Sequence, residues 1–274
     1  MIKGNSGASV ELVPPYIFKW DDSNPDRLSR QMDKQLIYKS FLGTVPCLEN
    51  IFEVPEVVNN SGRFRMPYYC GKNIIKHFQS SSSNDIIRVY RDIWKLIHEE
   101  TKQCIITPCL ESVLVGKLES LKYPNISKLL RCIDLTTDIP YGICHGDITF
   151  SNIIVCDKTV LIDFLDTYYE TPLQDIAKML QEIRLKWTLL KSNCECDETK
   201  ISIVYRHLED LLHSDIAKYC KEFSVDPKLI WVFYLITLLR LLPYTKEDYI
   251  VSIISKEIVD VESSLFDGRK IVSF

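Results

Sequence analysis

The chain has 274 residues, of which 46% are hydrophobic, with 33 lysines and arginines against 37 aspartates and glutamates. At about 100–200 residues per domain, this length predicts one large or two modest domains. The apolar content is enough for a core and excludes a disordered chain. The net charge of −4 lacks the basic excess typical of proteins that bind phosphate backbones or anionic membranes, so we expect no nucleic-acid partner.

The start of the chain and its most apolar run bear on localisation. A polar stretch follows Met1 where a secretory signal would need apolar residues, so we expect a cytoplasmic protein. The run at residues 229–242 is interrupted by Thr237 and Arg240 and is shorter than the ~20 residues that span a bilayer. It predicts a buried helix and no membrane span.

Ten scattered cysteines without a CxxC pair indicate reduced, mostly buried thiols. The oligomeric state is not predicted.

The first 66 residues are predicted to be mainly strands with one helix. Pro14 and Pro15 separate two short β-prone runs, which predicts a hairpin. A start signal at residues 23–25 precedes apolar residues at a roughly helical period, which predicts a helix against that hairpin. The predicted elements are strands at 9–13 and 16–20, a helix at 26–42, two extended segments bracketed by Pro46 and Pro55, and a strand at 64–69 that leads to a bend at Gly71.

After a serine run at residues 80–83, the chain is predicted to be mostly helical. A cap at Asn84 or Asp85 precedes an apolar stripe, which predicts the first helix. Later helices are predicted at residues 125–138, 172–190, 201–223, 227–242 and 246–264. Strands are predicted only once in this half, as a hairpin of residues 153–155 and 160–162 with a turn at 156–159.

The fold class predicted from this pattern is α+β. We expect a small, mainly β N-lobe at residues 1–66, a hinge and connector at 67–79, and a larger helical C-lobe at 80–274.

The stretch HGDITFSN at residues 145–152 directly precedes that hairpin, and Asp163 directly follows it. Positions 152 and 163 are symmetric about the predicted turn, so Asn152 and Asp163 are expected side by side. Two oxygen donors held in this way suit Mg²⁺, a hard cation that bridges phosphates. Asp147 would lie close by to accept a hydroxyl proton. The pattern is typical of phosphoryl transfer from a nucleotide.

A Gly-rich turn near the start of the chain is the expected counterpart of this loop. It leads into a strand whose hairpin partner carries Lys19. Small residues let backbone N–H groups approach phosphate oxygens, and a strand lysine can pair with the α- and β-phosphates. The residues expected to contact the nucleotide are Gly4, Asn5, Ser6, Gly7, Ala8 and Lys19. Almost no room remains before Gly4 for a first strand, so we expect that strand to be vestigial or the chain to be truncated.

At these residues the chain resembles the aminoglycoside phosphotransferase and choline kinase family of small-molecule kinases, which have a two-lobed, protein-kinase-like fold. The resemblance covers nearly the whole chain and rests on HGDITFSN, on LIDF and on the downstream P-x-x-D-I-A at residues 172–177. KGNSGAS, RQMDKQ and LIDFLD are more narrowly similar to phosphotransferases of bacterial surface-polysaccharide gene clusters.

The resemblance implies a role for each residue that matches the family's motifs. Asp147 would be the catalytic base, Asn152 and Asp163 the Mg²⁺ ligands, and Lys19 the lysine that pairs with ATP phosphates. Residues 4–8 would cover the nucleotide. The hinge that holds the adenine would be lined by Pro67, Tyr68 and Tyr69.

Further residues would support this site. The resemblance implies that His145 orders the loop and that Asp175 hydrogen-bonds the catalytic-loop backbone, although a carboxylate is favoured at any helix N-terminus. The glutamate that normally pairs with the lysine is replaced here by Gln31 or Gln35. A glutamine can orient the ammonium of Lys19 only through a neutral hydrogen bond.

The function predicted from these residues is an ATP-dependent kinase that transfers the γ-phosphoryl group to a hydroxyl of a small-molecule alcohol, preferably a sugar or sugar-like precursor. A protein kinase is not expected, because Gly146 replaces arginine and no activation segment follows Asp163. A nucleotide-binding pseudokinase or scaffold is the non-enzymatic alternative. The missing glutamate favours it weakly, whereas the retained catalytic, metal and lysine residues argue against it: Asp147, Asn152, Asp163 and Lys19.

A cationic acceptor, such as choline, ethanolamine or an aminoglycoside, is the alternative enzymatic function. Residues 1–66 hold 8 basic and 8 acidic residues, which leaves 25 against 29 afterwards, so the acidic surplus lies in the C-lobe. Trp187 and Trp231 could form a cation-binding wall. The residues expected to line the acceptor pocket are Asp166, Tyr168, Tyr169 and Glu170.

Overall fold

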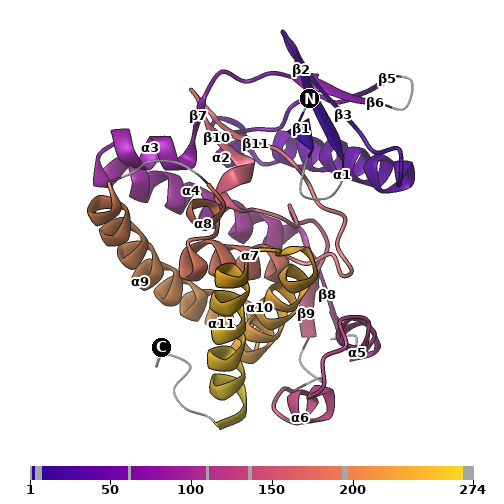
Figure 1. Ribbon diagram of the computed structural model, residues 1–274, viewed down its shortest axis with the longest axis vertical. Helices are drawn as coiled ribbons and strands as arrows, with labels where there is room; N and C mark the ends of the chain where they lie inside the picture. The colour runs from indigo at the N-terminus through magenta and orange to yellow at the C-terminus, as the bar shows by residue number, and fades with distance from the viewer. Residues whose placement is uncertain are drawn as a thin grey trace.

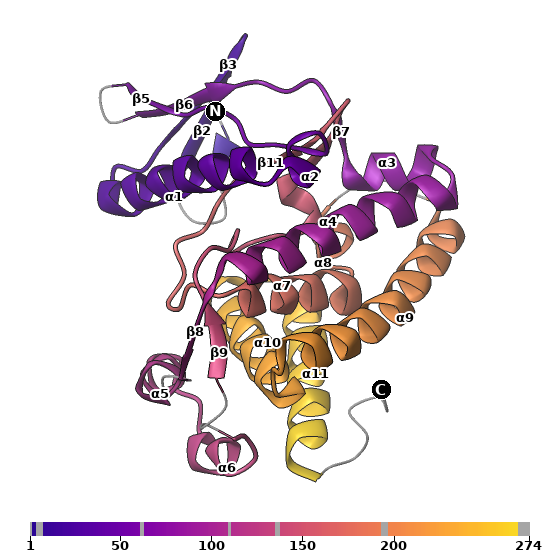
Figure 2. The same cartoon turned by 180° about the vertical axis from the view of Figure 1, so that it is seen from behind.

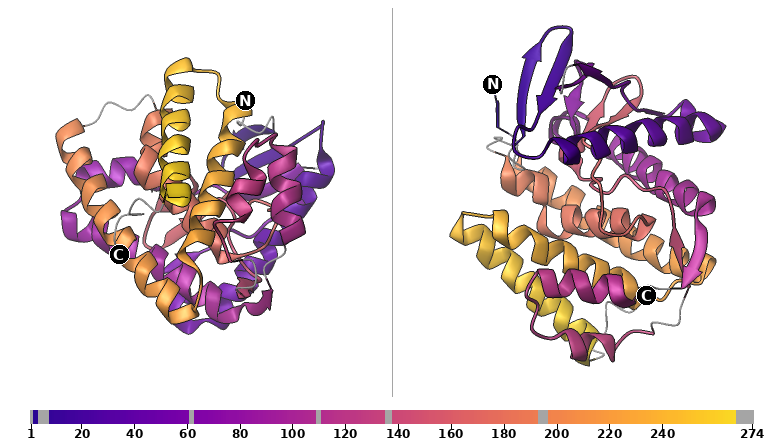
Figure 3. Two further views of the ribbon diagram at one scale, coloured as in Figure 1. Left: turned by 90° about the horizontal axis from the view of Figure 1, so that it is seen from below. Right: turned by 90° about the vertical axis from the view of Figure 1, so that its right-hand side faces the viewer.

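The computed structural model describes residues 2–3, 8–60, 63–108, 111–134, 138–192 and 197–267 of the chain. It has two parts, a sheet with one long helix at the top of Figure 1 and a larger group of helices below. The side view in Figure 3 shows the same division. The predicted α+β, two-lobed architecture is confirmed.

The N-terminal part of the chain contains, in order, β1 (Ile2–Lys3), β2 (Ser9–Val13), β3 (Tyr16–Trp20), α1 (Pro25–Thr44), α2 (Pro46–Glu49), β4 (Phe52–Glu53), β5 (Val58–Asn60) and β6 (Arg63–Pro67). Five of these strands form one antiparallel sheet in the order β1-β2-β3-β6-β5. The first strand is therefore present, although it has only two residues.

The predicted hairpin and helix of this lobe are confirmed. β2 and β3 pair along their whole length, with Pro14 and Pro15 at the turn. α1 begins after Asn24, whose side chain accepts a hydrogen bond from a backbone N–H of the first turn. Leu28 of α1 packs with Phe64 and other apolar residues of the sheet side in a small core of its own. The helix is thus fixed against the sheet.

The rest of the chain contains β7 (Lys72–Asn73), α3 (Ile74–Ser80), α4 (Ser83–Gln103), β8 (Ile105–Pro108), α5 (Glu111–Ser120), α6 (Ile126–Leu130), β9 (Asp138–Tyr141), the 3₁₀ turn η1 (Phe150–Asn152), β10 (Ile153–Val155), β11 (Thr159–Leu161), α7 (Pro172–Leu185), α8 (Trp187–Lys191), α9 (Glu198–Phe223), α10 (Pro227–Leu241), η2 (Leu242–Tyr244) and α11 (Asp248–Asp267).

α7 and α10 pack against each other at the centre of the helical lobe, with α4, α9 and α11 around them (Figure 2). α10 begins after the cap Asp226 and is buried almost throughout from Leu229 to Leu238. The segment Pro227–Tyr244 is long and apolar enough to cross a membrane by length and composition, but 56% of it is buried inside the fold. The prediction of a buried helix here is confirmed.

A second sheet of four strands joins the two lobes in the order β4-β11-β10-β7. Its centre is the predicted hairpin of the C-lobe, β10 and β11. β4 comes from the N-terminal part and pairs in parallel with β11, while β7 follows the hinge and pairs with β10. The hairpin is therefore held on both edges by segments that precede the C-lobe in sequence.

Several predicted elements are wrong in type or extent. Strands are not confined to one hairpin after residue 80, because β8 and β9 also form. Helix 125–138 is confined to α6, and its last predicted residue begins β9. The connector contains the helix α3, and the extended segment after Pro46 begins as the helical turn α2. Strands and helices this short have too few residues for a periodic pattern.

Helix boundaries also differ from prediction. α4 is capped by Ser82, whose side chain accepts from the backbone N–H of Asp85, so the predicted cap at Asn84 or Asp85 is wrong. Helix 172–190 is divided because Lys186 adopts a left-handed conformation with φ of 51°, which ends α7.

The cysteines are less buried than predicted. Seven lie in the described residues and all are free, but only Cys144 and Cys220 are buried, while Cys47, Cys70 and Cys156 are exposed.

Gly71 lies where the hinge passes closest to the β10–β11 hairpin. A Cβ atom there would lie 2.4 Å from Cys156 Sγ and 2.9 Å from the carbonyl oxygen of Val155. The carbonyl oxygen of Val155 cannot move away without disturbing β10, so we expect Gly71→Ala to destabilise the fold by about 1–3 kcal/mol.

Gly116 of α5 is the matched control, since a Cβ atom there meets nothing within 4 Å. Gly116→Ala should raise stability by roughly 0.5–1 kcal/mol, because alanine is the better helix former. Urea unfolding of both variants measures the difference. Equal stabilities for the two variants would contradict the close approach at Gly71.

Candidate active site

The candidate site begins at the open end of the β10–β11 hairpin. Ile153 pairs with Leu161, and the backbone N–H of Ile162 donates to the carbonyl of Asn152 at 3.1 Å. Asn152 therefore lies opposite Ile162, and Asp163 is one residue further on. The prediction that positions 152 and 163 are opposite each other is wrong by one residue, because the turn has three residues and not four. Both side chains still belong to the same end of the hairpin.

Asp147 and Asn152 are joined directly. The Asn152 side-chain nitrogen donates to the carbonyl oxygen of Asp147 at 2.8 Å and to its carboxylate Oδ2 at 3.1 Å. The backbone N–H of Thr149 also donates to the Asp147 carbonyl, at 2.7 Å. These bonds close the catalytic loop into a tight turn, with 30% of the Asp147 side chain left exposed.

Lys19 reaches this site from β3 in the other lobe. Its Nζ lies 2.5 Å from Asp163 Oδ1 and donates to Gln31 Oε1 at 3.3 Å. Of the two predicted glutamines, Gln31 is thus the one in contact with the lysine. Gln35 lies one turn further along α1, is buried, and donates instead to the carbonyl of Pro55 at 3.0 Å. The partner of the lysine is neutral, and the negative charge beside it comes from Asp163.

Asp175, at the start of α7, holds the backbone of the catalytic loop. Its carboxylate accepts from the N–H groups of His145 at 2.6 Å and of Gly146 at 2.7 Å. Gly146 has φ of +83°, and a Cβ atom there would lie 2.4 Å from the carbonyl oxygen of Leu165. The position thus requires glycine on both conformational and steric grounds.

His145 is buried beneath the loop and stacks on Phe164 at 4.2 Å between ring centres. Its Nδ1 accepts from the backbone N–H of Asp147 at 3.2 Å. Burial lowers the pKa of His145 to about 4, so the ring is neutral at physiological pH. A neutral ring that orients the next residues is consistent with a loop-ordering function and disfavours a second base.

Two contacts of α7 with the candidate catalytic loop, residues 145–152, were not predicted from the sequence. Lys178 Nζ lies 2.9 Å from Asp147 Oδ1, and the carboxylate of Glu182 accepts from the backbone N–H of Phe150 at 3.1 Å. Burial acts to raise the pKa of Asp147, but the ion pair with Lys178 outweighs it and the pKa is lowered. The sequence did contain one indication of these contacts, which is the spacing of the residues. Asp175, Lys178 and Glu182 lie at i, i+3 and i+7, on one face of a predicted helix.

The acidic residues expected to line the acceptor pocket form ion pairs with α1. Asp166 pairs with Arg30 at 2.5 Å, and Glu170 pairs with Lys34 at 2.6 Å, so both carboxylates are bound by cations of α1. Lys34 also donates to the carbonyl of Leu165 at 2.7 Å.

The two tyrosines of this segment pack toward the helical core. Tyr168 stacks on Phe233 of α10, and Tyr169 is buried, with its hydroxyl 3.2 Å from the hydroxyl of Thr107. The described contacts do not bring any of these four predicted residues onto Asp147.

The predicted nucleotide contacts are described only in part. Residues 4–7 lie outside the described residues, and Ala8 is buried just before β2. Pro67 ends β6, and the backbone N–H of Tyr68 donates to the Pro15 carbonyl at 2.8 Å, with the Tyr68 ring exposed. The Tyr69 hydroxyl donates to Glu53. The hinge is therefore attached to the N-lobe at both tyrosines.

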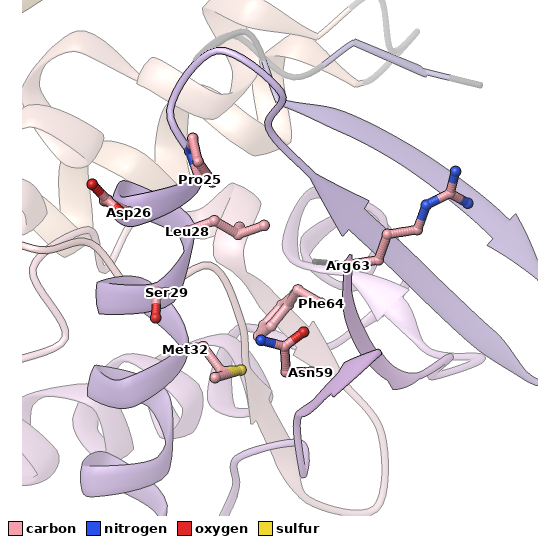
Figure 4. A pocket seen from close by; sticks show the side chains of 8 residues that line it. All are labelled: Pro25, Asp26, Leu28, Ser29, Met32, Asn59, Arg63 and Phe64. Atoms are coloured by element: carbon pink, nitrogen blue, oxygen red, sulfur yellow. The ribbon is translucent and has the colours of Figure 1, made fainter. Parts of the chain in front are cut away.

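A hollow of about 210 Å³ lies elsewhere in the N-lobe, between the start of α1 and the β5–β6 strands (Figure 4). Leu28, Met32 and Phe64 form its apolar wall, with Asp26 and Arg63 at its edge. None of its lining residues is a predicted site residue, so we do not assign the nucleotide or the acceptor to it.

Residues 78–190 match the sequence model of a family described as the phosphotransferase enzyme family. Over these residues the match agrees with the family resemblance found in the sequence. The matched segment contains the whole catalytic loop, the hairpin and α7. The prediction of a phosphotransferase with a hydroxyl group as acceptor is confirmed at the level of this family.

Two solved structures with the same fold are distant from this chain in sequence. A glucosamine kinase in complex with glucosamine, ADP and inorganic phosphate is 11% identical, with a TM-score of 0.57 over 96% of this chain and 82% of that chain. A second crystal form of glucosamine kinase is 12% identical, with a TM-score of 0.54 over 90% and 73% of the two chains.

A choline/ethanolamine kinase family protein from Mesorhizobium loti is 11% identical, with a TM-score of 0.44 over 93% of this chain and 85% of that chain. No curated protein has a sequence that matches this chain.

A buried acidic pair lies beneath the catalytic loop. Glu100 of α4 is fully buried, accepts from the hydroxyl of Tyr38 and lies near Asp175. Burial and the neighbouring Asp175 raise the pKa of Glu100 well above its usual value of 4.5. Burial raises the pKa of Asp175 to about 7, while its two backbone N–H bonds favour the ionised form, so the first proton of the pair lies on Glu100.

This protonation makes stability depend on pH. Because the pKa of Glu100 is raised in the folded state, its contribution is fully present below pH 4.5 and is lost as the pH rises toward the folded pKa. Glu100→Gln keeps the neutral form at every pH. We expect its melting temperature, relative to wild type, to increase steadily from pH 5 to about pH 8 in thermal melts.

The exposed Glu119 of α5 provides the control, since Glu119→Gln should follow the wild-type pH curve with a constant offset. A constant offset for Glu100→Gln as well would show that Glu100 is ionised in the folded protein.

Proposed function

We propose that this protein is an ATP-dependent small-molecule kinase that transfers the γ-phosphoryl group to a hydroxyl of a sugar or sugar-like acceptor. The observation that carries the proposal is the convergence of two contacts at one end of one hairpin, Asp147 with Asn152 and Lys19 with Asp163. The first is a carboxylate that accepts from the amide nitrogen of Asn152, and the second is a cation beside a half-exposed carboxylate. Such a set serves phosphoryl transfer by positioning and charge stabilisation.

The donor set fits a magnesium ion held with the nucleotide. Asn152 directs its nitrogen at Asp147, and its oxygen has only a long contact, 3.5 Å, with the Ser151 hydroxyl. Asp163 is 52% exposed. Within the described residues no cluster of three or more His, Cys, Asp or Glu could hold a metal, which agrees with a cation that keeps water and phosphate ligands. When bound, Mg²⁺ would neutralise charge on the β- and γ-phosphates.

The chain's own residues would divide the remaining work. Asp147 would orient the acceptor hydroxyl and accept its proton, and Lys19 would pair with the nucleotide phosphates. Asp175 and His145 would keep the loop in place through the backbone bonds described above. Residues 67–79 would form the hinge between an N-lobe of residues 1–66 and a C-lobe of residues 80–274, with Pro67, Tyr68 and Tyr69 against the adenine.

The ion pairs of α1 favour a sugar over a cationic acceptor. Asp166 and Glu170 already face Arg30 and Lys34, so their charge is compensated within the protein. A positively charged acceptor would have to compete with these pairs. Two of the similar structures are glucosamine kinases, which supports a sugar as the acceptor class. Because glucosamine carries an amine, they do not distinguish a neutral sugar from an amino sugar.

The tryptophans do not offer a cation-binding wall. The Arg184 guanidinium lies over the Trp231 ring at 5.7 Å, and Lys191 lies over the Trp187 ring at 5.4 Å. Both rings therefore already have a cationic partner from the chain itself. This argues further against choline or an aminoglycoside.

A pseudokinase is the second candidate, because the lysine contacts neutral Gln31 where the family has glutamate. Lys19 nevertheless lies within the site through Asp163, so the residues needed for turnover remain together.

Substitution of the two aspartates separates their functions. Asp147→Ala should lower acceptor phosphorylation by about 10²–10⁴-fold and leave Mg²⁺–nucleotide affinity nearly unchanged, because this carboxylate acts on the hydroxyl. Asp163→Ala should lose nucleotide affinity as well. Calorimetric titration with ADP and Mg²⁺, with acceptor-dependent ADP release, measures both effects.

The matched control is Asp166→Asn, which removes an exposed carboxylate three residues further on and should keep full nucleotide affinity. Equal losses of nucleotide affinity in Asp147→Ala and Asp163→Ala would contradict the assignment. A wild-type protein that neither binds nor hydrolyses ATP would favour the pseudokinase.

The acceptor class can be tested by screening neutral sugars, amino sugars, amino alcohols and aminoglycosides for acceptor-dependent ADP release. We expect the highest kcat/KM among the sugars, because the acidic side chains are already paired. A preference for choline or ethanolamine over every sugar would contradict this choice.

A further inference from the structure

Lys178 is a buried lysine of α7 to which the proposed kinase mechanism assigns no function. Lys178 is 7% exposed, and its ammonium has two described partners, Asp147 Oδ1 at 2.9 Å and Gln181 Oε1 at 3.1 Å. Gln181 follows on the same face of the helix and is itself buried. Together they extend the polar face that begins with Asp175 and ends with Glu182.

Stability does not explain a lysine at this position. Burial of an ammonium removes its hydration, and one ion pair with a carboxylate that is 30% exposed does not compensate fully. An apolar side chain of similar length would fill the same space at lower cost. The only described carboxylate in contact with Lys178 is the candidate catalytic one, which indicates that the charge serves the reaction.

The geometry around Asp147 limits where the phosphoryl group can lie. Asn152 occupies Oδ2 and Lys178 occupies Oδ1. A reactive acceptor hydroxyl must lie within about 2.6–3.2 Å of this carboxylate, and its oxygen about 3–3.5 Å from the γ-phosphorus. A lysine ammonium 2.9 Å from Oδ1 therefore lies on the same carboxylate that the acceptor hydroxyl must contact.

We propose that Lys178 is a catalytic residue whose ammonium donates to the γ-phosphoryl oxygens during transfer, with Gln181 as the residue that positions it. This rests on the proposed kinase function. Lysine has three N–H donors, so Nζ can keep Gln181 and Asp147 and still reach a phosphoryl oxygen with the third. The charge would lie on the side of α7, separate from Lys19, which approaches from β3.

The step is a simple displacement in which Lys178 forms and breaks no covalent bond. The acceptor oxygen bonds to the γ-phosphorus as the bond from that phosphorus to the β–γ bridging oxygen breaks. ADP leaves with the electron pair, and the hydroxyl proton passes to Asp147. The phosphorylated acceptor keeps the three equatorial oxygens, whose charge Lys178 helps to stabilise.

The test compares Lys178→Met, which removes the charge at similar size, with Lys178→Arg, which keeps it. For Lys178→Met we expect kcat for acceptor-dependent ADP release to fall by about 100-fold or more, with the ADP dissociation constant changed by less than about 3-fold. Lys178→Arg should recover at least about a tenth of the wild-type kcat. Gln181→Leu should lower kcat less than Lys178→Met does.

The matched control is Lys200 of α9, a partly buried lysine that donates to the carbonyls of Gln79 at 2.7 Å and Ser81 at 3.0 Å. Lys200→Met should leave kcat unchanged even if it lowers the melting temperature. Circular dichroism melts of every variant identify any loss that comes from unfolding alone.

A second comparison uses the Asp147→Asn background. If Lys178 acts on the phosphoryl group, Lys178→Met should lower the residual ATP hydrolysis of Asp147→Asn by a further 10-fold or more. If the second substitution has no further effect, Lys178 acts only by holding Asp147 and the proposal is wrong. Equal kcat in wild type and Lys178→Met would also overturn it.

Failure of the kinase function itself would give a different result. Wild-type protein with Mg²⁺–ATP would then show neither hydrolysis nor transfer to any acceptor, and the assignment of Lys178 would fall with it. Wild-type hydrolysis that is unaffected by Lys178→Met rejects Lys178 alone.

Discussion

The bidentate contact of Asp175 with the backbone of His145 and Gly146 is the interaction on which the site depends. It fixes a loop whose glycine has φ of +83° to the most buried helix of the C-lobe. From that fixed point, hydrogen bonds position the next residues. The Asp147 N–H donates to the His145 ring, and the Asp147 carboxylate accepts from Asn152.

The helix α7 is itself packed between α10, α9 and α4. The catalytic loop therefore has the rigidity of the core although it is a loop by secondary structure. The ionised carboxylate accepts both N–H groups most strongly, which agrees with the first proton of the acidic pair lying on Glu100.

The two lobes are joined by different means at the back and at the front of the site. At the back, β4 and β7 pair with the two edges of the β10–β11 hairpin, so the strands that carry the metal-binding candidates belong to a sheet that includes the N-lobe side and the hinge. At the front, one turn of α1 places Arg30, Gln31 and Lys34 against the segment after Asp163. The helix that orients Lys19 is thus the same helix that binds the acidic residues beyond the hairpin. A shift of α1 would move the lysine and this segment together, which couples the nucleotide side of the site to the acceptor side.

The sequence predicted what is encoded locally and missed what depends on contacts between distant segments. HGDITFSN, the hairpin after it and the long helices were found because each has its own motif or period. The one-residue error in the position of Asp163 came from the turn length, which shifts the register of the strands that follow.

Gln31 and Gln35 lie one turn apart on α1, so only the approach of β3 determines which of them contacts Lys19. β4 and β7 have two residues each and exist only because the hairpin lies between them. Lys178 belongs to no motif: its spacing from Asp175 puts it on one face of a predicted helix, but only the fold places that face beneath the loop.

The charges of the C-lobe show why net charge says little about an acceptor. The acidic surplus in sequence suggested a surface for a cation, but the carboxylates nearest the site each have a specific partner. Asp175 is bound to backbone N–H groups, Glu170 to Lys34, Asp166 to Arg30 and Asp147 to Lys178. Three of these partners are cations, and two of those come from the N-lobe, so part of the surplus counted within one lobe is compensated across the boundary between lobes. Beside Asp147 the compensating charge comes from Lys178 of α7. A site whose carboxylates are paired in this way has no free negative charge among these residues for a cation, and a neutral, hydrogen-bonding acceptor fits it best.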